Sequence, residues 1–291
     1  MNPYLLSVLL GIVEGLTEFL PVSSTAHLRI VEALMQINLQ DGFWKMYTIV
    51  IQLGAILALF ALFAGRLLRF LKTFPKGERG ESTAPTHPLT LIFVAFVCTA
   101  VPALLSKKLI GANLENISVM AWALLIGGVV MAAVDWLCKQ PRIQHIEEMS
   151  LPQAIWIGLV QTLSAIFPGT SRSMCTIAAG QVAGLSRAAA LEFSFFLSIP
   201  TMFAATGKEL LDTLRPGHSH AAVEATQTIA PLVMTTENWI TVAIGFVVSF
   251  VVAYVVVAWF LKWVQKHGFL PFAIYRVVLG ILLLAGVLGI K

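Results

Sequence analysis

The chain alternates between long apolar stretches and short polar segments. Six of the stretches are long enough for a helix to cross the hydrocarbon core of a membrane, which takes about 20 residues. Tryptophans lie near their ends, where amphipathic rings favour the membrane interface. The pattern predicts an all-α integral membrane protein with about six transmembrane helices, over Met46–Ala64, Pro88–Leu105, Ser118–Leu137, Ala188–Thr206, Trp239–Leu261 and Pro271–Ile290.

Two further apolar segments are interrupted before they are long enough to span. Tyr4–Leu20 ends at Pro21 and resumes after Ser23-Ser24-Thr25, and Ala154–Phe167 ends at a Pro-Gly pair and resumes after residues 170–173. Broken helices at membrane depth survive only where they line a cavity or are buried in protein. We therefore expect two re-entrant hairpins.

The two interrupted segments are copies of one another. Three predicted spans separate them, and an odd number reverses the second copy in the membrane, which gives an inverted repeat. We expect a single transmembrane domain over residues 1–291, with repeats at about 1–110 and 150–265, whose broken tips meet near the midplane. A shift of 147 residues places Gly11, Val13, Glu14, Leu16, Thr17, Pro21 and Ser24 on Gly158, Val160, Gln161, Leu163, Ser164, Pro168 and Ser171.

Composition supports the membrane assignment and limits the partners. Hydrophobic residues make up 58% of the chain and charged residues 12%, whereas soluble domains carry roughly 25% charged residues. A net charge of +4 fits loops beside lipid headgroups, so membrane lipids are expected partners and nucleic acid is not. The three cysteines have no metal-ligand spacing, and we expect no disulfide.

The distribution of Lys and Arg predicts the orientation, because short cytoplasmic loops are enriched in both. With the Gly65–His87 loop inside, ten such residues lie inside and six outside, which places both termini outside. The inside set is Arg66, Arg69, Lys72, Lys76, Arg79, Lys139, Arg142, Arg187, Lys262 and Lys266, and the outside set is Lys45, Lys107, Lys108, Lys208, Arg215 and Lys291.

Glu14 and Glu18 are the first candidates for chemistry. They lie four residues apart, so they share one face of a helix, and ionisable residues in an apolar run are expensive to bury. Together they could hold a divalent cation, Mg²⁺ or Ca²⁺, or one of them could act as a base. The structural alternative is that both reach an interface or pair with a buried cation.

The segment after the first break has the composition of a helix start. Ser23, Ser24 and Thr25 are natural N-caps, and the free N–H groups of a helix start bind anions. Simple capping would explain the hydroxyls alone. His27, about one turn further on, adds an imidazole that could activate a hydroxyl as nucleophile.

The second break adds a cation. Ser171, Arg172 and Ser173 repeat the helix-start chemistry, and a guanidinium binds phosphate as a bidentate fork. A structural pairing of Arg172 with Glu14 or Glu18 is the alternative, and a substrate could displace it. Of the other polar residues, we expect Asp135 and Arg276 at the membrane interface and Glu192 either beside the site or without a role. His218 and His220 are given no site role.

The first motif, Glu14-Gly-Leu-Thr-Glu18-Phe-Leu-Pro-Val-Ser-Ser24-Thr-Ala-His27, and the second, Pro168-Gly-Thr-Ser-Arg172-Ser, resemble the bacitracin-resistance family of undecaprenyl-diphosphate phosphatases. The resemblance covers essentially the whole chain. It implies a bacterial inner-membrane enzyme that recycles the carrier lipid of peptidoglycan synthesis, with a periplasmic site. Met174 and Ala26 stand where the family usually has Gly. The implied site residues are Glu14, Glu18, Ser24, His27, Ser171, Arg172, Ser173 and Thr176.

The favoured reaction is hydrolysis of undecaprenyl diphosphate to undecaprenyl phosphate and inorganic phosphate. Ser24 would attack the terminal phosphorus, His27 would take the proton, and Arg172 with the helix starts would hold the phosphates. Attack by His27 or by water stays open, as does the choice between a monomer and a homodimer. The rival function is a transporter or flippase for a polyprenyl phosphate lipid, which needs the phosphate site but no nucleophile.

Overall fold

The computed structural model describes residues 2–37, 42–77, 83–113, 116–214, 234–287 and 289. Within these ranges, the regular elements are eleven α-helices and two short 3-10 helices, η1 and η2. They are α1 (Pro3–Thr17), α2 (Ser24–Leu34), α3 (Gly42–Thr73), η1 (Ala84–Thr86), α4 (Pro88–Leu105), α5 (Lys107–Asn113), α6 (Ile117–Leu137), η2 (Ile146–Glu148), α7 (Leu151–Ile166), α8 (Arg172–Val182), α9 (Arg187–Leu214), α10 (Thr236–His267) and α11 (Leu270–Leu284). Of the residues considered above, Arg79, Arg215, His218, His220 and Lys291 lie outside the described residues.

The prediction of a multi-pass, all-helical membrane protein is confirmed. Five helices are long and apolar enough to cross a membrane, and they lie in α3, α4, α6, α9 and α10. The sixth predicted span is too long, because α11 has only 15 residues and ends at Leu284. Gly286 follows with φ 67°, a left-handed conformation that terminates helices.

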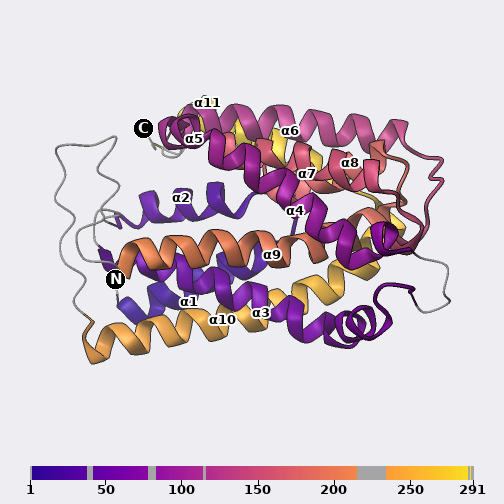
Figure 1. Ribbon diagram of the computed structural model, residues 1–291. Helices are drawn as coiled ribbons and strands as arrows, with labels where there is room; N and C mark the ends of the chain where they lie inside the picture. The colour runs from indigo at the N-terminus through magenta and orange to yellow at the C-terminus, as the bar shows by residue number, and fades with distance from the viewer. Residues whose placement is uncertain are drawn as a thin grey trace.

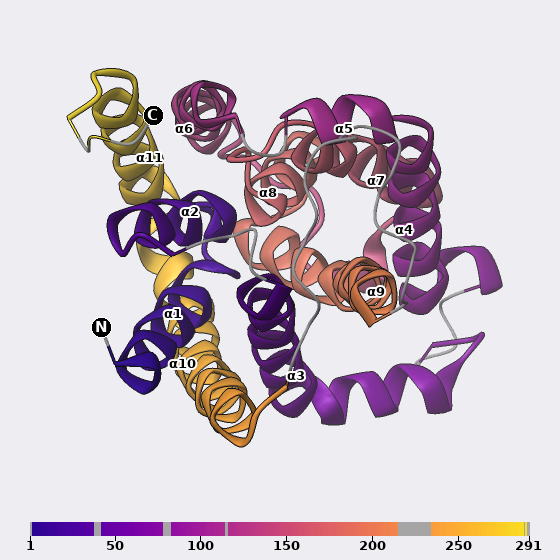
Figure 2. The ribbon, with the colours of Figure 1, turned by 90° about the vertical axis from the view of Figure 1, so that its left-hand side faces the viewer.

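The helices form one bundle in which α9 is central (Figure 2). The most apolar window of α9 is 61% buried, more than in any of the other four long helices. In the end-on view, α1 and α10 lie side by side on one flank and α4 and α7 on another, with α6 against α11. Gly11 of α1 and Gly158 of α7 allow the close contacts of α1 with α10 and of α7 with α4. A Cβ at Gly11 would lie 2.8 Å from the Gly245 carbonyl oxygen, and a Cβ at Gly158 would lie 2.3 Å from the Ala95 carbonyl oxygen.

The interrupted segments are short helices that run in opposite directions. α1 and α7 begin at opposite ends of the bundle (Figure 1), and each is followed by a break and an 11-residue helix, α2 or α8. The start of α1 and the end of α11 lie at the same end. The residue boundaries of the two repeats stay a prediction. In such a repeat α1 is equivalent to α7 and α4 to α10, so the contact of α1 with α10 should be matched by a contact of α7 with α4. Both contacts are present.

The register of the two breaks differs from the sequence alignment by one residue. Ser23 and Ser171 are the equivalent N-caps, with φ values of 75° and 72°, and their side chains accept from the N–H of Ala26 and Met174. The offset there is 148 residues (171 − 23), not 147. Gly169 supplies the extra residue, at φ 91° and so close to α6 that a Cβ would lie 2.6 Å from the Met120 carbonyl oxygen. Ser24 therefore corresponds to Arg172.

Two acidic residues belong to the framework of the bundle. Asp135 is buried and accepts from Arg187 Nε at 2.7 Å and from the Phe269 N–H at 3.1 Å, so it joins α6, α9 and the start of α11. Asp135 lies near the end of α6, where it was expected, but its side chain is buried against protein. Glu192 of α9 pairs with Arg66 Nε of α3 at 2.6 Å, and this pair accounts for its partial burial.

Candidate active site at the two helix breaks

The two breaks are joined by hydrogen bonds. Ser173, in the first turn of α8, donates to the carbonyl oxygen of Leu20 in the first break at 3.0 Å. Arg276 of α11 donates to the Pro21 carbonyl in the first break at 3.2 Å, and to Gly169 and Thr170 in the second at 3.2 and 2.9 Å. The starts of α2 and α8 therefore face a common site.

A chain of three polar side chains crosses this site. The Ser24 hydroxyl donates to Glu18 Oε2, and Arg172 Nη2 donates to the other carboxylate oxygen, Glu18 Oε1, at 3.3 Å. The side chains of Arg172 and Glu18 are only 12% and 9% exposed. One carboxylate is thus positioned both to take a proton from a hydroxyl and to hold a guanidinium.

The Arg172 guanidinium has hydrogen-bond donors that its protein partners use weakly or not at all. Its guanidinium lies 5.8 Å from the centre of the Phe19 ring, and Nη1 donates to the Ser194 carbonyl of α9 at a long 3.4 Å. Arg172 Nε has no hydrogen-bond partner among the residues that the structure describes. A buried guanidinium with a free donor and two long bonds is well suited to bind an oxyanion in place of some of these partners.

Glu14 is the most deeply buried acid of the site. It is 0% exposed, and neither carboxylate oxygen receives a hydrogen bond from any residue that the structure describes. The charges that act on it most strongly are those of Glu18 and Arg172. Two orphaned oxygens beside a second carboxylate fit a hard divalent cation. The described residues contain no cluster of three or more His, Cys, Asp or Glu for a metal, so water and phosphate oxygens would complete the coordination of such a cation, as is common for Mg²⁺.

Both ring nitrogens of His27 have partners other than the Ser24 hydroxyl. Its Nδ1 lies 2.7 Å from the Ser23 carbonyl oxygen, and its Nε2 lies 2.6 Å from the Tyr275 hydroxyl. The predicted pairing of the Ser24 hydroxyl with His27 is therefore wrong for this structure, and Glu18 takes the place of the imidazole. The reason is geometric, because a ring one turn into α2 folds back onto the carbonyl that begins the helix.

The remaining predicted residues support the site to different degrees. Ser171 and Ser173 share a hydrogen bond at 3.0 Å, and Thr176 Oγ1 lies 2.6 Å from Ser194 Oγ, which ties α8 to α9. Thr25 is exposed on the first turn of α2. Thr176 thus anchors the helix that carries Arg172, whereas the Thr25 side chain lies on the surface of the protein.

The sequence matches one family over nearly its full length. The model described as "Bacitracin resistance protein BacA" matches residues 7–282. This chain belongs to the BacA family. It is 61% identical over 286 residues to an undecaprenyl-diphosphatase of Koribacter versatilis, with 98% of each chain covered. It is 41% identical to the undecaprenyl-diphosphatases of Wolinella succinogenes, over 96% of each chain, and of Thermus thermophilus, over 94% of this chain and 93% of the relative.

This BacA-family chain contains two site neighbours that sequence reasoning missed. Arg276 was expected at the membrane interface, but it is fully buried and donates to four backbone carbonyls, those named above and that of Ala123. A charged residue inside an apolar run was the signal that could have found it. Tyr275 gave no such signal, because it lies 248 residues from His27 in the chain.

Met174 and Ala26, the two departures from the family pattern, occupy equivalent positions. Each is the third residue after its N-cap and donates its N–H to that serine. The Met174 methyl group lies so close to Gly127 of α6 that a Cβ on Gly127 would approach it to 2.8 Å. The side chain is therefore directed toward α6 and leaves the start of α8 open beside Arg172.

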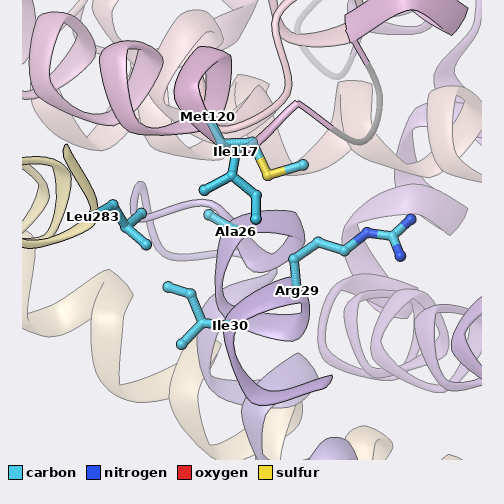
Figure 3. Close-up of a pocket in the computed structure, with 6 residues that line it drawn as sticks. All are labelled: Ala26, Arg29, Ile30, Ile117, Met120 and Leu283. Atoms are coloured by element: carbon cyan, nitrogen blue, oxygen red, sulfur yellow. The ribbon is translucent and has the colours of Figure 1, made fainter. Parts of the chain in front are cut away.

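A small apolar cavity lies against α2, beside the first break. Its lining comes from α2, α6 and α11, and the Arg29 side chain extends away from the apolar cluster (Figure 3). The cavity adjoins Ala26, one residue before His27, and has no catalytic group of its own. The lining residues are Ala26, Arg29, Ile30, Ile117, Met120 and Leu283.

Proposed function

We propose that this protein hydrolyses undecaprenyl diphosphate to undecaprenyl phosphate and inorganic phosphate. The reaction recycles the carrier lipid of peptidoglycan synthesis, and removal of its diphosphate substrate would confer resistance to bacitracin. The observation that carries the proposal is the chain from Ser24 through Glu18 to Arg172 at the start of two helices. Membership of the BacA family and the activity for which its relatives are named support the same reaction.

The binding step uses the two helix starts and the guanidinium. The first N–H groups of a helix have no partner within it, so they attract anions. Arg172 begins α8 and Ser24 begins α2, which places both groups at such ends. The diphosphate would replace Glu18 as the principal partner of Arg172, since the bond between them is long at 3.3 Å.

The chemical step uses Ser24 and Glu18. The Ser24 oxygen attacks the terminal phosphorus while its proton passes to Glu18, and the bond to the bridging oxygen breaks to release undecaprenyl phosphate. Water then attacks the phosphoserine, releases inorganic phosphate and restores the Ser24 hydroxyl. Arg172 and the helix N–H groups stabilise the charge that builds on the phosphoryl oxygens.

A divalent cation fits beside Glu14 and Glu18. Their carboxylates, together with diphosphate oxygens, would hold Mg²⁺ or Ca²⁺. When bound, such a cation would neutralise part of the diphosphate charge. Glu14 would act only as a metal ligand, because no described residue donates a hydrogen bond to it.

The location that fits this reaction is the bacterial inner membrane, with the site open to the periplasm. The ends of α3 and α10 lie at one end of the bundle (Figure 1), and they carry half of the inside set, namely Arg66, Arg69, Lys72, Lys262 and Lys266. Single cysteines at the exposed Gln144 and Glu237, in a background without the native cysteines, test this. An impermeant thiol reagent should label only the cysteine at 237 in intact cells. The reverse pattern would overturn the orientation.

The rival function, transport of a polyprenyl phosphate lipid, would use the same phosphate site. The bond between Ser24 and Glu18 favours hydrolysis, since a carrier has no need of a hydroxyl aimed at a base. Purified protein with undecaprenyl diphosphate and Mg²⁺ should release inorganic phosphate, and a chelator should reduce the rate. Binding of the lipid without any phosphate release would favour the carrier. A homodimer stays a prediction.

A further inference from the structure

Tyr275 of α11 contacts His27 of α2 in two ways. The Tyr275 hydroxyl lies 2.6 Å from His27 Nε2, and the two rings are nearly parallel, with centroids 5.6 Å apart and planes inclined by 12°. A stacked pair that also shares a hydrogen bond fixes both the plane and the rotation of the imidazole. This contact brings a third element, α11, to a site that the two broken hairpins otherwise form.

The partners of His27 define its protonation pattern. The Ser23 carbonyl can only accept a hydrogen bond, so Nδ1, 2.7 Å away, must carry the hydrogen. In the neutral ring Nε2 is then an acceptor, and the Tyr275 hydroxyl must be its donor. The lone pair of Nε2, which is the reactive atom of this tautomer, is therefore covered by Tyr275.

α11 is held rigidly next to this contact. Arg276, the following residue, donates to the carbonyl oxygens of Pro21, Ala123, Gly169 and Thr170 and is fully buried. These bonds fix α11 against both breaks. Tyr275 itself is 45% exposed, so its ring lies at the open side of the site.

We propose that Tyr275 is a positioning residue of the phosphatase site: it holds His27 in its Nδ1–H form and aims Nε2 at the open side. The proposal rests on the proposed hydrolysis. When a diphosphate enters, the hydroxyl transfers its hydrogen bond to a phosphate oxygen, and Nε2 becomes free to accept the proton of the water that hydrolyses phosphoserine. Tyr275 thus keeps the base neutral and aligned until substrate is present.

The first measurement is the turnover of Tyr275→Phe, which retains the ring stack and removes only the hydroxyl. We expect kcat to fall by at least about tenfold, since general base catalysis contributes about 10² to 10⁴ and misalignment loses part of it. KM should rise only by the loss of one hydrogen bond to phosphate, and the thermal unfolding midpoint should change little. Tyr254→Phe is the matched control, because that ring on α10 is similarly exposed, at 41%. A kcat within about twofold of wild type would overturn the proposal.

The second measurement does not depend on turnover. Diethyl pyrocarbonate modifies unprotonated imidazole nitrogens, and the rate at His27 can be followed by mass spectrometry of the peptide that contains it. We expect faster modification in Tyr275→Phe than in wild type and no change in Tyr254→Phe. An unchanged rate would show that the hydroxyl does not cover Nε2 and would overturn the proposal, even if kcat fell.

The two measurements also separate this proposal from the proposed function. If the wild-type protein releases no phosphate, the proposed hydrolysis fails, while the modification rate still decides whether Tyr275 covers His27. If the wild type is active and both rates are unchanged in Tyr275→Phe, only the positioning role fails.

Discussion

The two broken hairpins have the same backbone and opposite chemistry. Ser23 and Ser171 cap α2 and α8 with the same left-handed conformation, so each hairpin presents a helix start to the site. The side chains that follow differ, because Ser24 in the first hairpin corresponds to Arg172 in the second. The repeat therefore supplies two similar helix starts, with a hydroxyl as the first side chain of one and a guanidinium as the first side chain of the other.

The two copies also differ in the helices that precede the breaks, α1 and α7. Glu14 in α1 aligns with Gln161 in α7, and both are buried. Gln161 Nε2 donates to Thr99 and Thr201 at 3.0 and 3.2 Å, whereas Glu14 receives no hydrogen bond from the described residues. Gln161 Oε1, like both oxygens of Glu14, has no hydrogen-bond partner among the described residues, so the two side chains differ in the bonded amide nitrogen of Gln161. Under the proposed function, the carboxylates of Glu14 and Glu18 make the first hairpin the one that would hold a cation.

A large fall in turnover should follow from altering the guanidinium of the second hairpin. Arg172→Lys keeps the charge but loses the planar fork, so we expect kcat to fall by about 10² to 10³, the range seen when one donor to a transition-state oxyanion is lost. Steady-state phosphate release measures it. Arg29→Lys, the same change on α2 at a side chain 27% exposed, is the control. Near-normal turnover in Arg172→Lys would remove Arg172 from the phosphate site.

The next prediction concerns the stability contributed by Arg276, which donates hydrogen bonds to both hairpins. Arg276→Met leaves four buried carbonyls without their donor, and each such loss costs about 1 to 3 kcal/mol before relaxation. We expect the unfolding midpoint in detergent to fall by several degrees and the activity to fall with it. Arg142→Met, at an exposed arginine, should be within about 0.5 kcal/mol of wild type. An unchanged midpoint in Arg276→Met would show that the breaks do not depend on this clamp.

The apolar runs, both breaks and the meeting of Glu18, Ser24 and Arg172 could be predicted because each has a local signal: run length, proline with hydroxyls, or ionisable residues in apolar sequence. The one-residue shift at Gly169 could not, because it depends on how closely the backbone approaches Met120. The bond from Ser24 to Glu18 and the contact of Tyr275 with His27 depend on tertiary packing. Arg276 carried the same signal as Glu14, a charge in an apolar run, and was misassigned because it was taken to lie at a span end.

The smallest effect should come from exchanging the aligned pair. Glu14→Gln gives the first copy the amide of the second, so the metal concentration for half-maximal activity should rise by at least about tenfold. Its unfolding midpoint should be unchanged or higher, because an unpartnered buried carboxylate is lost. Gln161→Glu should lower the midpoint and leave the metal dependence alone. Unchanged metal dependence in Glu14→Gln would contradict the assignment of Glu14 as a metal ligand.

The central claim is that Ser24 is the nucleophile and Glu18 its base, and rapid quenching of the reaction with terminally ³²P-labelled undecaprenyl diphosphate tests it most directly. We predict acid-stable label on the peptide that contains Ser24 in the wild type, and accumulation of that label if His27→Ala slows the second step. Ser24→Ala should bind the lipid but release no phosphate above background. Substantial phosphate release by Ser24→Ala, or label trapped on His27 instead, would contradict the account.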